Sequence, residues 1–190
     1  MRKIIEEVFN SHQEAFTYVK EKSSLIEEIA GVLIDALQGQ HKILFCGNGG
    51  SAADSQHLAA EFVGRFKKDD IVLPALALSV NTSMLTAIAN DFGFEKVFSQ
   101  QVKALGSPGD VLVAISTSGN SANVACAVRQ AHSQGLKTIG FLGNEGGTLK
   151  DLVDIPLLVK ANDTARIQEM HILIGHILCE LVDQFFSGGK

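Results

Sequence analysis

Short apolar segments alternate with helical segments along most of this chain. We expect strands at 42–46, 73–78, 111–115, 137–142 and 155–159. Helices are expected from 52 to about 65, at 82–90 and 94–105, up to Gly135 before the fourth strand, and at 164–186 after the fifth. Strands that alternate with helices in this way form a parallel sheet that helices cover on both faces. The sequence therefore predicts an α/β fold, a three-layer sandwich around a five-stranded parallel sheet, in which ligands bind at the carboxyl ends of the strands.

Two helices are predicted before the first strand. Apolar residues recur at helical spacing from Lys3 to about Lys20, and Ser24 to Glu27 reads as a capping box that opens a second helix. We expect residues 1–40 to serve oligomerisation, although such helices can also cover their own sheet. We expect residues 41–190 to form the α/β domain, as one structural unit with the helices.

Composition excludes several classes of partner. The formal net charge is −5 and no dense run of Lys or Arg occurs, so we expect no nucleic-acid partner. No apolar run is long enough to span a bilayer, and the N-terminus carries acids where a signal peptide is apolar. Cys46, Cys126 and Cys179 are widely spaced in apolar stretches, which favours buried free thiols and a cytoplasmic location.

Two glycine- and serine-rich loops each follow a predicted strand and open a helix, Gly47–Ser51 and Ser116–Ser121. Glycine allows close approach of the backbone, hydroxyls donate to phosphate oxygens, and a helix N-terminus adds unpaired N–H groups. The alternative is a turn in which Asn120 or Ser121 caps the helix. The first loop also matches GxGxxA, but the next strand ends without the acid that a dinucleotide-binding fold requires, and no P-loop lysine is present.

Four polar residues on predicted helices are candidates for chemistry. His57 and Glu61 share one face of the helix after the first loop, and Gln168 and His176 lie on the last helix among apolar neighbours. Two imidazoles, a carboxylate and an amide oxygen suit Zn²⁺ or a similar divalent ion. The alternatives are a surface ion pair for His57 and Glu61 and a hydrogen-bonded core histidine at 176. For the remaining histidines, including His171, we favour a structural role.

Four segments, at 46–62, 89–94, 115–123 and 164–176, together resemble the phosphoheptose isomerase family of sugar isomerase (SIS) domain proteins in residues, order and spacing. The resemblance implies a flavodoxin-like SIS fold and a homotetramer with active sites at subunit interfaces. It also implies conversion of sedoheptulose 7-phosphate to D-glycero-D-manno-heptose 7-phosphate through a cis-enediol, which supplies heptose for lipopolysaccharide or other surface glycans.

The resemblance also implies roles for individual residues. The catalytic pair falls on Glu61 and His176, and one Zn²⁺ per subunit falls on His57, Glu61, Gln168 and His176. Substrate contacts fall on Asn48, Gly49, Gly50, Ser51, Glu61, Asn90, Asp91, Ser116, Thr117, Ser118, Ser121 and Gln168. Some members carry an acid where this chain has Ala165, so we assign no role there.

Two other readings of the resemblance remain. The same fold occurs in a non-enzymatic SIS tetramer that binds the replication initiator DnaA, but that branch lacks the Glu and the second His that this chain keeps at Glu61 and His176. Other SIS isomerases usually carry additional domains, for which 190 residues leave no room.

Overall fold

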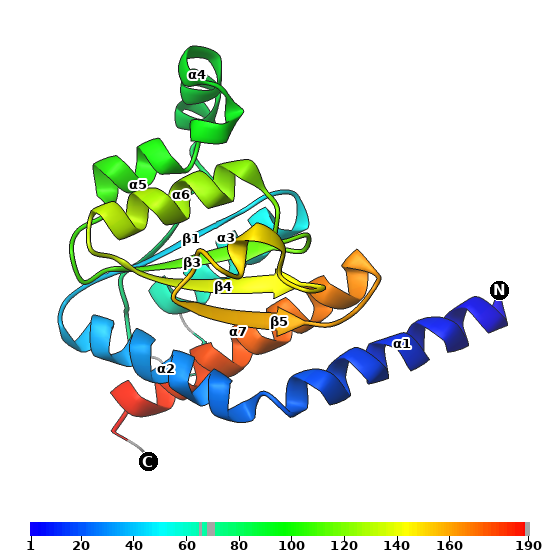
Figure 1. Cartoon of the computed structure of the whole chain (residues 1–190). Helices are drawn as coiled ribbons and strands as arrows, with labels where there is room; N and C mark the ends of the chain where they lie inside the picture. The colour runs from blue at the N-terminus through cyan, green and yellow to red at the C-terminus, as the bar shows by residue number, and fades with distance from the viewer. Residues whose placement is uncertain (65, 68–70, 189–190) are drawn as a thin grey trace.

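One parallel sheet forms the centre of the protein. The computed structural model describes residues 1–64, 66–67 and 71–188. The strands are β1 (Ile43–Gly47), β2 (Ala75–Ala77), β3 (Val111–Ser116), β4 (Lys137–Gly143) and β5 (Ile155–Val159). Their order is β2-β1-β3-β4-β5, and helices cover both faces (Figure 1), which confirms the predicted three-layer fold. The order reverses between β1 and β3, so the loops that follow these two strands flank the switch point where such sheets bind ligands.

The helices divide into two layers. One layer contains α1 (Arg2–Lys20), α2 (Ser23–Gln38), α3 (Gly50–Val63) and α7 (Thr164–Phe186). The other contains α4 (Thr82–Phe92), α5 (Ser99–Leu105) and α6 (Ala122–Ser133), with the short 3-10 helices η1 (Phe94–Lys96) and η2 (Gly147–Leu149).

The strand sequences supply apolar side chains to both layers. In β3, Val111, Val113 and Ile115 join the core beneath α2, α3 and α7, whereas Leu112 and Ala114 join the core beneath α5 and α6. Successive side chains of a strand point to opposite faces, so a strand that is buried on both sides must be apolar throughout. The continuous apolar runs in the sequence follow from this requirement.

Two elements project from this body. In Figure 1, α1 extends sideways to the N-terminus and α4 stands beyond α5 and α6. The projecting part of α1 exposes Ile4, Ile5, Val8 and Phe9. Over the part of the chain that the structure describes, none of the helices has both the length and the apolar character that crossing a bilayer requires.

Several predicted boundaries need correction. Ser24 does not cap α2: the amide of Lys22 bonds to the carbonyl of Val19, so the chain turns directly from α1 into a helix that already starts at Ser23. The helix expected from Phe94 to Leu105 is split into η1 and α5, because the intervening bend directs Val97 and Phe98 into the core.

Two more expectations are resolved only in part. The helix after the first loop starts two residues earlier than predicted, at Gly50, and its predicted end at Arg65 lies outside the described residues. All three thiols are free, but Cys126 is partly exposed rather than buried.

Candidate active site

The first loop turns sharply from β1 into α3. Gly49 has φ 55° and ψ −119°, a conformation that essentially only glycine adopts without strain. The turn leaves Gly49 and Gly50 exposed, at the N-terminus of α3. The first amides of a helix have no partner within the helix and carry partial positive charge, so this position suits an anionic group.

The second loop is stabilised by hydrogen bonds from its own side chains. The hydroxyl groups of Ser116 and Ser121 lie 3.0 Å apart, and the Ser116 hydroxyl accepts a hydrogen bond from the amide of Gly119 at 3.1 Å. Asn120 accepts a hydrogen bond from the amide of Thr148. Ser121 occupies the N-cap position of α6 but makes no side-chain cap bond. The two residues that the turn-and-cap alternative relies on therefore do not cap the helix.

A pair of side-chain amides joins the two loops. Asn48 donates to Asn123 at 2.9 Å, and Asn123 donates back at 2.8 Å. Asn123 is buried in the first turn of α6. Sequence reasoning assigned no role to Asn123, although it lies in the motif that continues the second loop. The reciprocal bonds fix the relative position of the two loops.

Helices α3 and α7 lie side by side and run in the same direction. A Cβ atom added to Gly50 would overlap the amide group of Gln168, and one added to Gly175 would approach a side-chain carbon of Leu58 to 2.5 Å. The absence of a side chain at each glycine thus allows the close packing of the two helices. It also places Gln168 against the end of the first loop, where α3 begins.

Further along the same pair of helices, three of the predicted residues converge. The Nε2 atoms of His57 and His176 lie 2.8 Å apart, and the Oε1 atom of Glu61 lies 3.3 Å from the Nε2 atom of His57. Each of the three offers a ligand atom, and these atoms all lie within 4.8 Å of one another. The Glu61 side chain is 20% exposed and that of His57 is 47% exposed, so the group is open to solvent on one side.

This group has the composition and spacing of a metal site. Ligand atoms about 2.1 Å from a tetrahedral ion lie about 3.4 Å from one another. The distance between Glu61 and His57 is close to this spacing, and the two imidazoles need to separate by about 0.6 Å. Since all three ligand atoms already lie within 4.8 Å of one another, His57, Glu61 and His176 could hold a divalent metal ion after small side-chain movements.

The remaining predicted residues lie apart from this group. Gln168 and His176 are eight residues apart on α7, which corresponds to a rise of about 12 Å, so one chain does not bring the Gln168 amide to the imidazoles. Asn90 and Asp91 are exposed on α4, where Asn90 donates to Asp91 at 2.8 Å. Figure 1 places α4 beyond α5 and α6, on the opposite side of the sheet from α7.

A partly buried carboxyl group and a fully buried imidazole lie on α3 and α7. The Oδ2 atom of Asp54, on α3, is buried without a hydrogen bond, and burial raises the pKa of this carboxyl to about 6 although the charge of His57 acts in the opposite direction. His171, on α7, is fully buried against Phe141. Burial lowers the pKa of His171 to about 4, so the imidazole is neutral at pH 7, as the structural role predicted for it requires.

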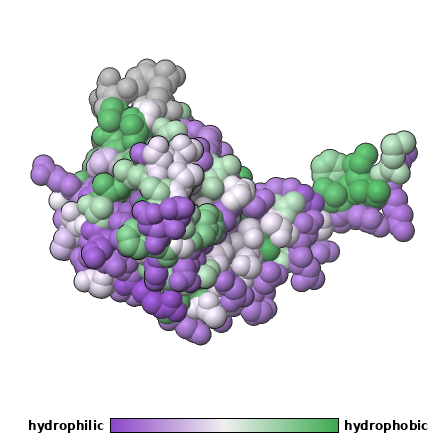
Figure 2. All heavy atoms as spheres, turned by 90° about the horizontal axis from the view of Figure 1, so that it is seen from above, coloured by the Kyte–Doolittle hydropathy of each residue, from purple (hydrophilic) through white to green (hydrophobic). Residues whose placement is uncertain are grey.

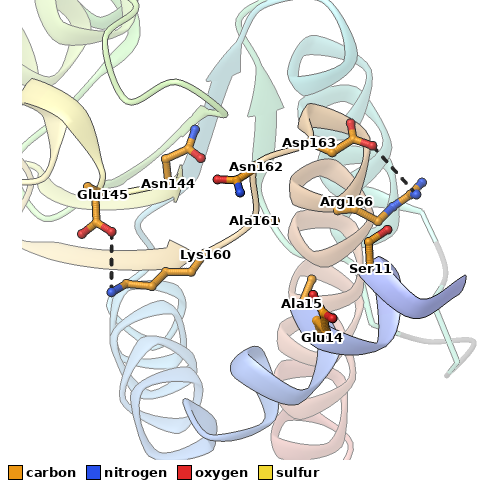
Figure 3. A pocket seen from close by; sticks show the side chains of 10 residues that line it. All are labelled: Ser11, Glu14, Ala15, Asn144, Glu145, Lys160, Ala161, Asn162, Asp163 and Arg166. Carbon is orange, nitrogen blue, oxygen red and sulfur yellow. Dashed lines mark ion pairs between the residues drawn. The ribbon is translucent and has the colours of Figure 1, made fainter. Parts of the chain in front are cut away.

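A separate cavity of about 480 Å³ lies between α1, the ends of β4 and β5, and the start of α7 (Figure 3). None of the predicted site residues lines it. Its buried cation, Arg166, is paired with Glu169, which also contacts His12 of α1 at 2.7 Å. The charges at this end of the cavity are thus compensated within the chain, and they tie α1 to α7.

Comparison with known proteins gives a consistent result. The model of the SIS domain family matches residues 8–143. The chain is 56% identical to a phosphoheptose isomerase of Nitratiruptor sp. over 96% of its own length and 98% of the relative.

Two solved structures are similar throughout. The phosphoheptose isomerase of Neisseria gonorrhoeae is 44% identical, with a TM-score of 0.91 over 96% of this chain and 98% of that one. The enzyme of Francisella tularensis is 36% identical, with a TM-score of 0.93 over 96% of this chain and 97% of that one. Together with the site geometry, these similarities show that the chain belongs to the phosphoheptose isomerase family of SIS domain proteins.

Proposed function

We propose that this chain interconverts sedoheptulose 7-phosphate and D-glycero-D-manno-heptose 7-phosphate, as a step towards heptose for lipopolysaccharide or other surface glycans. The observation that carries this proposal is the convergence of His57, Glu61 and His176 on two parallel helices, one of which begins at a glycine loop. The names of the relatives support the choice of reaction. Because a binding tetramer has no need of an acid–base pair, Glu61 and His176 favour an enzyme over the DnaA-binding alternative.

The sugar phosphate would bind across the carboxyl edge of the sheet. The two loops offer hydroxyls and backbone amides, which are suitable donors to a phosphate group. Gln168 lies where it can contact the same ligand, because its amide packs against Gly50. The proposed contacts are Asn48, Gly49, Gly50, Ser51, Glu61, Ser116, Thr117, Ser118, Ser121 and Gln168, together with Asn90 and Asp91.

The reaction moves one proton between neighbouring carbons. Glu61 takes a proton from C1 of the open-chain ketose while His176 delivers one to the C2 oxygen, which gives the cis-enediol. The hydroxyl on C1 then returns a proton to His176, and Glu61 delivers its proton to C2, which gives the aldose. The Oε1 atom of Glu61 lies 3.3 Å from His57, and a carboxylate has a second oxygen that can accept the proton.

We assign the metal site to Zn²⁺, with His57, Glu61 and His176 as ligands. A bound ion would polarise the substrate carbonyl. Coordination and proton transfer both draw on Nε2 of His176 and so exclude each other at any one moment. The resemblance to the family also implies Gln168 as a ligand of the Zn²⁺ ion, and this stays a prediction.

The proposed assembly is a homotetramer with active sites between subunits. Exposed apolar side chains cover one end of α1, which appears as a green cluster on the projecting arm in Figure 2. Asn90 and Asp91 stand on the exposed α4, from which a second subunit can complete the site. Oligomerisation through residues 1–40 and a cytoplasmic location remain predictions.

Turnover of sedoheptulose 7-phosphate, measured with and without a chelator, tests the proposal. Glu61→Gln and His176→Gln should each lower kcat by at least a hundredfold while the protein stays folded and tetrameric. A folded variant with near-normal turnover removes that residue from the mechanism. Full activity of the metal-free enzyme removes the metal but leaves the acid–base pair.

A further inference from the structure

Phe66 and Lys67, shortly after the end of α3, lie against α7 beside the proposed catalytic imidazole. The ring of Phe66 stacks on the imidazole of His176, with the ring centres 5.8 Å apart and an angle of 27° between the planes. This distance lies in the range of favourable aromatic pairs. Phe66 is only partly exposed, so its ring covers one face of His176.

The next residue fixes the same segment one turn further along α7. The ammonium group of Lys67 lies 2.6 Å from a carboxylate oxygen of Glu180. His176 and Glu180 are four residues apart and so share one face of α7. Phe66 and Lys67 therefore contact His176 and Glu180, which lie one helical turn apart on the same face of α7.

His176 is constrained from a second direction by His57. Its ring meets the ring of His57 edge-on, at 78° and with 5.0 Å between centres, while the two Nε2 atoms lie 2.8 Å apart. That contact restrains the His176 ring at one atom, and the His57 side chain that makes it is itself about half exposed. The ring of Phe66, stacked on the imidazole, adds a restraint on the orientation of the His176 ring plane.

We propose that Phe66 is a positioning residue, which holds the imidazole plane of His176 so that Nε2 faces His57 and Glu61. The role rests on the function proposed above for His176. Partners that orient a ligand in this way typically change metal affinity or activity by 10- to 100-fold when they are replaced. Phe66 touches neither substrate nor metal in this role and acts only through His176.

The test compares Phe66→Leu with Phe66→Tyr in the full chain. Leucine keeps apolar bulk but removes the flat ring, whereas tyrosine keeps the ring. Three quantities are measured: the NMR shifts of the His57 and His176 ring protons without metal, the affinity for Zn²⁺ by competition with a chromophoric chelator, and kcat and KM separately. Phe62→Leu is the matched control, because Phe62 packs on Phe45 in the core and should lower stability without changing Zn²⁺ affinity.

We expect Phe66→Leu to lose the ring-current shift at His176, to bind Zn²⁺ about tenfold more weakly and to lower kcat with little change in KM. Phe66→Tyr should restore all three. The proposal is overturned if Phe66→Leu binds Zn²⁺ as tightly as the unaltered protein, or if Phe62→Leu weakens Zn²⁺ binding as strongly. If the unaltered protein binds no Zn²⁺ or lacks turnover, the function proposed above fails. The role of Phe66 is then decided by the ring-proton shifts of His57, which report the orientation of the His176 ring: unchanged shifts in Phe66→Leu overturn it.

Discussion

The Nε2 atoms of His57 and His176 lie within hydrogen-bonding distance although 119 positions separate the two residues in the chain. Without a metal, one of these nitrogens must carry the shared proton and the other must accept it. A metal ion would replace that proton and draw in Glu61 as well. The pair therefore links metal binding, protonation and stability.

Zn²⁺ should stabilise the folded chain through this group. At a free concentration one hundred times the Kd, the expected gain is about 2.7 kcal/mol. Differential scanning fluorimetry with and without Zn²⁺ measures it as a rise in Tm. The rise should vanish in His57→Ala and persist in His41→Ala, which alters a partly exposed histidine outside the group. An equal rise in both variants would place the ion elsewhere.

Asp54→Asn should stabilise the protein at high pH. The pKa of Asp54 is raised from 3.8 to about 6, so ionisation above pH 6 opposes folding and the penalty disappears below about pH 4. Allowing for its partial exposure, we expect a gain of about 1 to 2 kcal/mol at pH 8. Urea unfolding at pH 8 and pH 4 checks it, with the exposed Asp151→Asn as control. A gain that is the same at both pH values would show that ionisation is not the cause.

His171→Leu should make the protein less sensitive to acid. The folded pKa of about 4 lies below the ordinary 6.5, so the unfolded chain binds the proton more tightly and stability falls as pH drops from 6.5 towards 4. The loss due to this residue is on the order of 3 kcal/mol. Between pH 7 and pH 4, the free energy of unfolding of His171→Leu should therefore fall less steeply with decreasing pH than that of the unaltered protein. An unchanged slope would mean that His171 keeps a partner in the protonated state.

The amide pair between the loops should contribute to both stability and substrate binding. Asn123→Ala leaves the Asn48 amide without its partner, and we expect a loss of about 2 kcal/mol together with a higher KM. Asn48→Ala and the double variant complete a mutant cycle. Strictly additive losses would contradict a direct interaction between the two side chains.

Removing apolar surface from α1 should dissociate the proposed tetramer. Phe9 is 68% exposed, and the double change Ile5→Glu and Phe9→Glu puts charges on this part of the helix. Size-exclusion chromatography with light scattering should then report smaller species, with an intact fold by circular dichroism. Glu6→Gln and Glu7→Gln, on the same helix, should leave the assembly intact. A tetramer that persists in the charged variant would exclude this part of α1 as a subunit contact.

The fold was largely predictable because its signals are local. The boundaries of α7, Thr164 and Phe186, coincide with those expected from the sequence, and β5 matches residue for residue. The capping box at Ser24 failed because the short connection from α1 placed that serine inside a helix that had already begun. A capping-box sequence marks the start of a helix only when the residues before it are not already turning into that helix.

The site was predictable only in part. Spacing put His57 and Glu61 on one face, but nothing local could show that α3 and α7 meet, and the family resemblance supplied that pairing. Asn123 lay within a recognised motif without a distinguishing feature. Phe66 could not be identified from the sequence, because an aromatic residue after a helix is common. Its proposed role depends on its contact with His176, which is distant in the chain.

Gly175 sits next to His176 and has no side chain to hold Leu58 away. Any residue larger than glycine would act as a wedge between the two helices and would widen the gap across which the histidines meet. The distance between the two imidazoles therefore depends on the lack of a side chain at position 175, and a substitution there would alter the proposed metal site without replacing any of its ligands.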